Sequence, residues 1–312
     1  MKHVVKCPVC KKSESTFWAS AVDAEYMTTT ESFQFHQCKT CQVLFIDPVP
    51  TDKLDTIYPS NYYSFSSTKI SMISKVKMWI DCRIFKKLLS QLKGDSLNIL
   101  DVGGGAGSQL NSLRSIEKRE LNTYIIDLDS KAEQSAINDG HNYFCSRIED
   151  YETELKFDFV LLLNLIEHVE DPRKVLSKIR SILTPQGIVL IKTPNYDSLD
   201  ARLFRHNNWG GYHCPRHWVL FTKESFVKLA TETDLNIEHF SYTQGAPFWA
   251  QSILFWLFKK DMIKVTQEKP MVYHPLFGLL SAVFAGIDFI RRPFSKTSQM
   301  FFVLKTESGE EK

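Results

Sequence analysis

The feature that most constrains this chain is a glycine cluster directly after an apolar run, in LNILDVGGGAGSQL at 97–110. Four of the thirteen glycines lie between Gly103 and Gly107. Glycine permits positive φ and lets a ligand approach the backbone without a Cβ in the way. A strand that ends in glycines and leads into a helix presents free N–H groups, where nucleotide-like ligands commonly bind. A plain tight turn is the alternative, but one or two glycines suffice for a turn.

Apolar runs alternate with helical patterns after this loop, and this alternation predicts the fold class. The runs are nearly continuous, as expected for strands covered on both faces. We expect an α/β protein with a doubly wound, mostly parallel seven-stranded sheet. Its 312 residues, 43% hydrophobic with a net charge of +2, are ordinary for a globular protein. The expected strands are 97–103, 122–128, 142–148, 157–164, 187–194, 236–243 and 299–307.

Four cysteines in the first fifty residues form two Cys-x-x-Cys pairs. Two tight turns that supply four thiolates are a common ligand set for a closed, structural Zn²⁺ site, so a small zinc ribbon is predicted. Two unrelated pairs of reduced cysteines are the alternative. The scattered remaining cysteines fit a reducing compartment, and MKHVVKCPVCKK lacks the apolar core of a secretory signal, so a cytoplasmic location is expected. The predicted zinc ligands are Cys7, Cys10, Cys38 and Cys41.

The pattern divides the chain into four parts. The ribbon precedes a connector that is turn-rich and then helical, and an apolar helical insert interrupts the sheet before its last strand. The expected parts are the ribbon at 1–50, the connector at 51–95, the α/β domain at 96–244 and 299–312, and the insert at 245–298.

An acid ends the second apolar run. Asp127 follows Gly107 by twenty residues, where an acid accepts hydrogen bonds from the ribose of a nucleotide-like ligand. The glycines are spaced Gly103-x-Gly105-x-Gly107, unlike the G-x-G-x-x-G of dinucleotide sites, and Asp101 precedes them. This form resembles the first motif of the class I S-adenosylmethionine-dependent methyltransferases.

The segment 157–195, FDFVLLLNLIEHVEDPRKVLSKIRSILTPQGIVLIKTPN, carries the most specific resemblance. It is similar over its whole length to the fourth-to-fifth-strand region of class I methyltransferases, nearest to the subgroup of ubiquinone-type and sugar C-methyltransferases. Gln186 departs from that subgroup's L-x-P-G-G pattern. PRHWVLFT at 215–222, and FIDPVP at 45–50 behind the cysteine knuckle, resemble the same subgroup.

The resemblance implies S-adenosyl-L-methionine as the cofactor. Asp101 and the glycine backbone would hold the methionine part, Asp127 the ribose hydroxyls, and Leu128 would flank the adenine. The third strand of the family usually ends in an acid near the adenine, and Ser146 stands there instead. The implied cofactor-binding residues are Asp101, Gly103, Gly105, Gly107, Asp127, Leu128, Ile148, Asn164 and Leu165.

Three histidines are the catalytic candidates: His168, His213 and His217. Methyl transfer requires an aligned acceptor and the exclusion of water, and a base helps when the acceptor is a hydroxyl or an acidic carbon. Each histidine also has a structural alternative, in the turn after the fourth strand or in the packing of a lid at 196–221. Glu167 is interpreted as a charge at a helix start.

Three functions are open for the chain. The first is methyl transfer to a small-molecule, sugar or lipid-linked acceptor. The second is an RNA methyltransferase whose ribbon docks nucleic acid, but residues 1–50 hold five basic and five acidic residues, and such a module should be basic. The third is a non-catalytic binding protein on the same fold, against which the intact loop and Asp127 argue.

The insert bears on the choice of acceptor. Its apolar runs, FWAQSILFWLF and PLFGLLSAVFAGI, are shorter than the roughly 20 residues of a spanning helix. Seven basic residues against three acidic ones give it a net charge of +4. Apolar faces with a basic rim predict a peripheral contact with the cytoplasmic face of a membrane. A hairpin packed on the sheet or on a homodimer partner fits the same pattern.

Overall fold

The computed structural model describes residues 4–59 and 72–306, so 60–71 of the expected connector and the end of the chain lie outside it. Seven strands form the main sheet in the order β10-β11-β8-β7-β4-β5-β6. Neighbours pair in parallel except β11, which runs antiparallel to β8 and β10. The predicted fold class is confirmed. The strands are β4 Ser96–Val102, β5 Glu120–Asp127, β6 Asn142–Cys145, β7 Phe157–Leu163, β8 Leu183–Pro194, β10 Leu235–Thr243 and β11 Gln299–Thr306.

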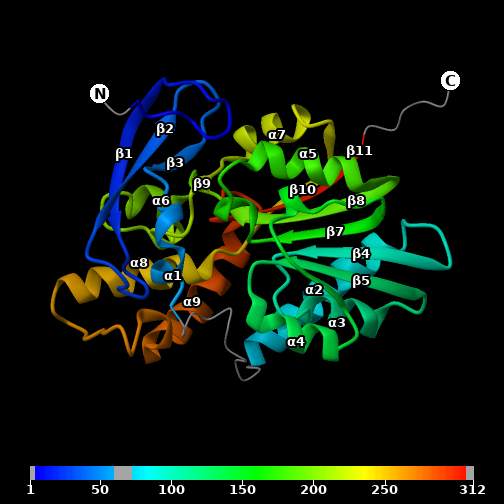
Figure 1. Cartoon of the computed structure of the whole chain (residues 1–312). Coiled ribbons are helices and arrows are strands. Elements are labelled where there is room, and N and C mark those ends of the chain that lie inside the picture. Colours follow the sequence, from blue (N-terminus) through cyan, green and yellow to red (C-terminus); the bar gives the residue numbers. More distant parts are fainter. Residues whose placement is uncertain (1–3, 60–71, 307–312) are drawn as a thin grey trace.

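Helices cover both faces of this sheet, with α2, α3 and α4 on one side and α5 and α7 on the other (Figure 1). Successive residues of a strand pack on opposite faces of the sheet. Leu100 lies in the core that contains Leu176 of α5, and Ile99 lies in the core that contains Leu113 of α3. Both faces are therefore apolar, as the continuous runs predicted. The helices are α2 Met72–Leu89, α3 Ser108–Ile116, α4 Ser130–Asn138, α5 Pro172–Ile182 and α7 Lys223–Thr231.

The third strand is shorter than predicted. The backbone N–H of Ser146 donates to the carbonyl of Asp127 at 3.1 Å, and the chain then leaves the sheet edge. Ile148, expected within the strand, begins the short 3-10 turn η3 (Ile148–Asp150) and is buried there. The pairing with β5 therefore ends at Cys145, and Ile148 is buried outside the sheet.

The N-terminal strands form a second, antiparallel sheet in the order β1-β2-β3-β9. The first three belong to the ribbon: β1 Ser15–Val22, β2 Ser32–Cys38 and β3 Leu44–Asp47. The fourth, β9 (Val219–Leu220), comes from the predicted lid. Trp18 adds a hydrogen bond of 3.0 Å from its Nε1 to the Tyr212 hydroxyl. The ribbon and the lid thus share one sheet.

The second half of the lid, 208–221, is buried. The lid contains α6 (Leu199–Leu203) and the 3-10 turn η5 (Gly210–Tyr212), and Trp209 and Tyr212 are each 1% exposed. The insert supplies α8 (Ala246–Lys259), η6 (Met271–Tyr273) and α9 (Pro275–Arg291), and α8 covers the lid. A Cβ on Gly210 would lie 2.5 Å from the Phe248 carbonyl oxygen, so glycine lets α8 pack this closely. The short η1 (Thr51–Lys53) and α1 (Leu54–Ile57) follow the ribbon.

A buried ion pair joins the ribbon to the lid. Arg216 donates from Nη2 to Oδ2 of Asp23 at 2.8 Å and from Nη1 to Oδ1 at 3.2 Å, and both side chains are fully buried. Burial alone would raise the pKa of Asp23, but the charge and hydrogen bonds of Arg216 hold it below its usual value. Arg216 also donates to the Ile57 carbonyl at 2.6 Å. Asp23 and Arg216 thus neutralise each other inside the protein.

We predict that Asp23→Ala lowers the free energy of unfolding by about 3–5 kcal/mol, because it leaves the Arg216 guanidinium buried without its counter-charge. Denaturant unfolding followed by circular dichroism measures this. The matched control is Glu31→Ala, which removes an exposed ion pair with Lys53 and should leave the midpoint nearly unchanged. An equal decrease in the free energy of unfolding of the two variants would show that the buried pair stabilises the protein no more than an exposed one.

Candidate active site

The glycine loop follows β4, and its conformation explains why glycines are needed. Gly103, Gly105 and Gly107 have φ of +75°, +52° and +84°, in the region that other residues rarely adopt. A Cβ on Gly103 would lie 2.9 Å from Leu165 Cδ1, so close packing is a second reason there. At Gly105, nothing described lies within 4 Å of such a Cβ. The loop is thus packed at one glycine and open at another.

Asp101 lies beneath this loop. Its side chain is 2% exposed, and its Oδ2 has no hydrogen-bond partner among the described residues. Burial, with a smaller contribution from the charge of Asp127, raises the pKa of Asp101 to about 8. A buried carboxyl oxygen without a donor is costly, and a cationic or N–H-bearing ligand against the loop would satisfy it. This orphaned atom fits the methionine end of the implied cofactor.

Asp127 ends β5 and holds the loop. Its Oδ2 accepts the N–H of Gly105 at 2.8 Å, and its Oδ1 accepts the N–H of Asp129 at 2.9 Å. The carboxylate is only partly buried. Because each carboxylate oxygen has more than one lone pair, both can still accept from ribose hydroxyls. The residue fits its implied role while shaping the loop.

The other implied cofactor residues surround the same edge of the sheet. Leu128 is 60% exposed beside Asp127, while Ile148 is buried in η3. Asn164 follows β7 with φ +57°, and its side chain contacts Gln299 of β11. The strand order reverses beside β4, and parallel α/β sheets bind ligands at the carboxyl ends of strands at such a point. The structure brings the predicted residues together there.

The three candidate histidines also meet. His168 lies in the 3-10 turn η4 (Ile166–His168), directly after Leu165, and His213 and His217 come from the lid. Ring centroids are 4.7 Å apart for His168 and His217, 4.8 Å for His213 and His217, and 6.0 Å for His168 and His213. The Nδ1 of His213 lies against Oε2 of Glu25 of the ribbon, and both side chains are buried. The cluster adjoins the glycine loop through Leu165.

Burial sets the charge of the cluster. It lowers the pKa of His168 to about 3, with the nearby His213 adding to the effect, and it lowers the pKa of His217 well below its usual value. Both rings are therefore neutral at neutral pH. Burial also raises the pKa of Glu167 to about 8.

Sequence analysis interpreted Glu167 as a charge at a helix start, and it lies in the first turn of η4, but its burial was not foreseen. The side chain is fully buried, and its Oε2 accepts the Thr193 hydroxyl at 2.9 Å. The lid covers it: the Trp218 N–H donates to the Glu167 carbonyl at 2.7 Å. Glu25 was also missed as part of the site. Its position beside His213 depends on a contact between distant segments, and no local pattern signals it.

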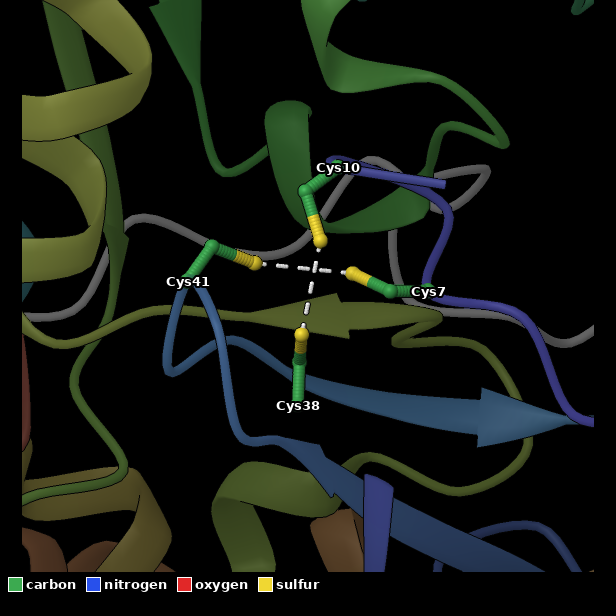
Figure 2. A group of neighbouring side chains, drawn as sticks. All are labelled: Cys7, Cys10, Cys38 and Cys41. Atoms are coloured by element: carbon green, nitrogen blue, oxygen red, sulfur yellow. Dashed lines mark hydrogen bonds between the residues drawn. The ribbon is translucent and has the colours of Figure 1, made fainter. Parts of the chain in front are cut away.

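The predicted zinc ligands converge at the start of the ribbon. Cys7 Sγ lies 3.5 Å from Cys41 Sγ, Cys10 Sγ lies 3.4 Å from Cys38 Sγ, and all four atoms are within 4.8 Å of one another. Figure 2 shows them pointing toward a common centre. A tetrahedral zinc with Zn–S bonds of about 2.3 Å needs sulfurs about 3.8 Å apart, so the four fit zinc.

The two knuckles have the same backbone geometry. The residue after each second cysteine, Lys11 or Gln42, has φ near +60°, at +61° and +58°. Its N–H donates to the carbonyl of the first cysteine, Cys7 or Cys38, at 2.9 and 3.1 Å. Each turn therefore presents its two thiols to the same side, as a structural metal site requires.

We predict one tightly held zinc in this cysteine site, lost in Cys7→Ser or Cys38→Ser, with the ribbon then losing its order. Elemental analysis after purification without added metal gives the stoichiometry. Cys145→Ser, an exposed cysteine outside the site, is the control and should keep the metal. Zinc content that does not change with Cys38→Ser would refute the assignment.

Comparison with known proteins establishes the family. A family model described as "Methyltransferase domain" matches residues 78–240, more than half of the chain. The chain belongs to this family and is a class I S-adenosylmethionine-dependent methyltransferase, which confirms the resemblance of its motifs.

The curated relatives match part of the chain. The ubiquinone biosynthesis O-methyltransferase of Rhodopseudomonas palustris (strain BisB5) is 31% identical over 125 residues, 36% of this chain and 47% of the relative. The mitochondrial ubiquinone biosynthesis O-methyltransferase of Dictyostelium discoideum is 29% identical over 116 residues, 32% of this chain and 36% of the relative. The match thus spans about half the length of the bacterial relative, or less for the second.

Solved structures show the same fold. Coclaurine N-methyltransferase, bound to N-methylheliamine and SAH, has a TM-score of 0.51 at 12% identity and covers 78% of each chain. A putative sarcosine dimethylglycine methyltransferase from Galdieria sulphuraria has a TM-score of 0.51 at 13% identity, covering 78% of this chain and 89% of its own. These identities support the architecture alone.

Proposed function

We propose that this enzyme methylates a hydroxyl or an acidic carbon of a small-molecule, sugar or lipid-linked acceptor. The observation that carries the proposal is the continuity from Leu165, which packs on the glycine loop, to the buried histidine cluster that begins at His168. Bound S-adenosylmethionine supplies an activated methyl group and its own leaving group. The names of the curated relatives, ubiquinone biosynthesis O-methyltransferases, favour an oxygen acceptor.

The residues of this chain hold the cofactor and shield the reaction. In this proposal Asp101 and the glycine backbone hold the methionine part, Asp127 the ribose, and Leu128, Ile148, Asn164 and Leu165 the rest of the pocket. The buried Trp209 and Tyr212 of the lid exclude water from the acceptor side.

The histidine cluster handles the acceptor. We assign the general base to His213, because the carboxylate of Glu25 beside it would orient the ring and stabilise its protonated form. His168, which is half-buried, and His217, which is buried, are neutral and line the site. A small cavity lies beside His213 and Glu25, between the ribbon, the lid and α8. This cavity, about 10 Å³, holds one water molecule at most, so in this proposal the ribbon contributes to the acceptor site through Glu25.

We predict that Asp127→Ala weakens the binding of S-adenosylmethionine by roughly 1.5–3 kcal/mol, the scale of hydrogen bonds to a charged group. The same change frees Gly105, which adds to the loss. Isothermal calorimetry measures the affinity, and Asp139→Ala, which removes an acid at the far end of α4, is the control. Wild-type protein that fails to bind this cofactor, or Asp127→Ala binding it equally well, would contradict the assignment.

The insert leaves an exposed apolar stripe on α9. Leu279, Val283, Ile287 and Ile290 recur at helical spacing and are 42% to 73% exposed, and Phe294 beyond the helix is 89% exposed. Among the described residues of α9, Asp288 alone is buried, where it accepts the N–H of Gly245 at 2.8 Å. No helix in the described ranges is long and apolar enough to cross a membrane.

We propose that this stripe contacts the surface of an anionic membrane. Exposed Lys259 and Lys260 end α8, and Arg292 follows α9, so basic groups border the apolar side chains. Arg291 is excluded from this role because its Nε donates to Asp288 at 2.8 Å and the side chain is 15% exposed. Such a combination suits an interfacial helix, and it would bring the enzyme to a lipid-linked acceptor.

We predict that the protein floats with anionic vesicles at low salt and that Lys259→Glu/Lys260→Glu weakens this, because each basic group near the surface contributes about 1 kcal/mol. Lys86→Glu/Lys87→Glu on α2 makes the same charge change at exposed positions away from the stripe and should bind normally. Wild-type protein that ignores the vesicles and runs as a homodimer would assign the stripe to a protein interface.

A further inference from the structure

The histidine cluster contains a second group of atoms arranged like metal ligands. One ring nitrogen each from His168 and His217 and a carboxylate oxygen of Glu167 lie within 4.8 Å of one another. Two of the residues come from η4 and the third from the lid. The group is separate from the cysteine site of the ribbon, and the proposed base, His213, is not one of its members.

Backbone carbonyls fix the tautomers of both rings. His217 Nδ1 lies 2.8 Å from the Gly211 carbonyl oxygen, and His168 Nδ1 lies 3.0 Å from the Arg216 carbonyl oxygen. A carbonyl only accepts, so each Nδ1 carries the proton and each Nε2 is the acceptor atom of its ring. Metal-bound histidines are commonly held in this way, with the other ring nitrogen donating to a carbonyl or a carboxylate.

The carboxylate of Glu167 is satisfied at one oxygen only. Its Oε2 accepts the Thr193 hydroxyl, while Oε1 has no hydrogen-bond partner among the described residues. His217 Nε2 faces that oxygen at 3.9 Å. Two acceptor atoms that face each other in a fully buried site repel unless a proton or a cation lies between them. A proton on Glu167 meets this need when no cation is bound, and the convergence of a third ligand atom, from His168, is the observation that points to a cation site.

We propose that Glu167, His168 and His217 bind a divalent first-row metal ion, of which Zn²⁺ is the probe used below, on the acceptor side of the methyltransferase site. Two histidines and one carboxylate are a ligand set of catalytic zinc and of other open metal sites, which keep a position for substrate. Bonds of about 2.0–2.2 Å place such ligand atoms about 3.4 Å apart. The three atoms lie within 4.8 Å of one another, so closure by up to about 1.4 Å forms the site.

The proposal deepens the proposed function and rests on it for its chemical role. A cation here would bind an acceptor through an ionisable hydroxyl and lower the pKa of that hydroxyl. His213, which is held by Glu25, is then available to take the proton. The acceptor class that follows is one with a hydroxyl, with or without a neighbouring oxygen as a second ligand, rather than an amine.

Metal counting tests the proposal without an acceptor. After incubation with excess Zn²⁺ and desalting, we expect two zinc ions per wild-type chain, one in Glu167→Gln and one in His217→Gln. His239→Gln, which changes an exposed histidine elsewhere, should retain two. In titrations the affinity of the second site should fall at least 100-fold in Glu167→Gln, since even outer partners of metal ligands contribute 10- to 100-fold.

Cobalt substitution guards against variants that fail to fold. Two Co²⁺ ions in the wild type should give both the intense thiolate bands of the ribbon and the weaker bands of a nitrogen and oxygen site. One metal per wild-type chain, or a second metal retained in both Glu167→Gln and His217→Gln, overturns the proposal. Cofactor affinity measured on the same samples separates the two claims: one metal with normal cofactor binding contradicts only the metal site, and two metals without cofactor binding contradict the proposed function.

Discussion

The buried ion pair between Asp23 and Arg216 is the contact on which the acceptor side of this enzyme depends. Two desolvated charges are stable only when both are fully paired, and here the fork of the arginine meets the two carboxylate oxygens. The pair fixes the backbone at Arg216. The carbonyl of Arg216 accepts a hydrogen bond from His168, and the next residue is His217. This ion pair therefore links the ribbon, the lid and the histidine cluster, together with the pairing of β3 with β9.

The methyltransferase sheet positions the other half of the site. β4 delivers Asp101 and the glycine loop, β5 delivers Asp127, and β7 leads through Leu165 into the turn that holds Glu167 and His168. The hydroxyl of Thr193, near the end of β8, fixes one oxygen of Glu167. Because these strands are parallel, their carboxyl ends meet at one edge, and the glycine loop and the histidine cluster, the proposed cofactor and acceptor sites, become neighbours.

The sheet could be predicted from the sequence because burial on both faces leaves continuous apolar runs, and the ribbon because Cys-x-x-Cys turns have fixed geometry. The cofactor-binding residues were predicted from the family resemblance, which rests in part on the spacing of the glycines. The buried acids could not be predicted. Nothing in the segments around Glu25 and Glu167 predicts that their side chains are buried. They are buried in the structure, where β3 of the ribbon pairs with β9 of the lid.

Packing also decided which side of the insert is exposed. Both apolar runs looked alike in the sequence. In the structure α8 buries Trp249 beside Phe204 of the lid and Leu254 in a cluster with Ala24 and Met271, while α9 leaves most of its apolar side chains exposed or half-buried. The basic residues at the end of α9 also differ. Arg291 forms an ion pair with Asp288, whereas Arg292 is exposed. Periodicity alone gives a helix its faces, but the partner that covers a face is a tertiary property.

The central claim is that the cofactor site and the buried histidine cluster form one continuous active site. A crystal structure with bound S-adenosylhomocysteine tests it most directly. The account predicts the ribose hydroxyls on Asp127 and the sulfur facing Glu167, His168 and His217, with no protein backbone between them. A sulfur that faces away from the cluster, or a ligand bound away from the glycine loop, would contradict it.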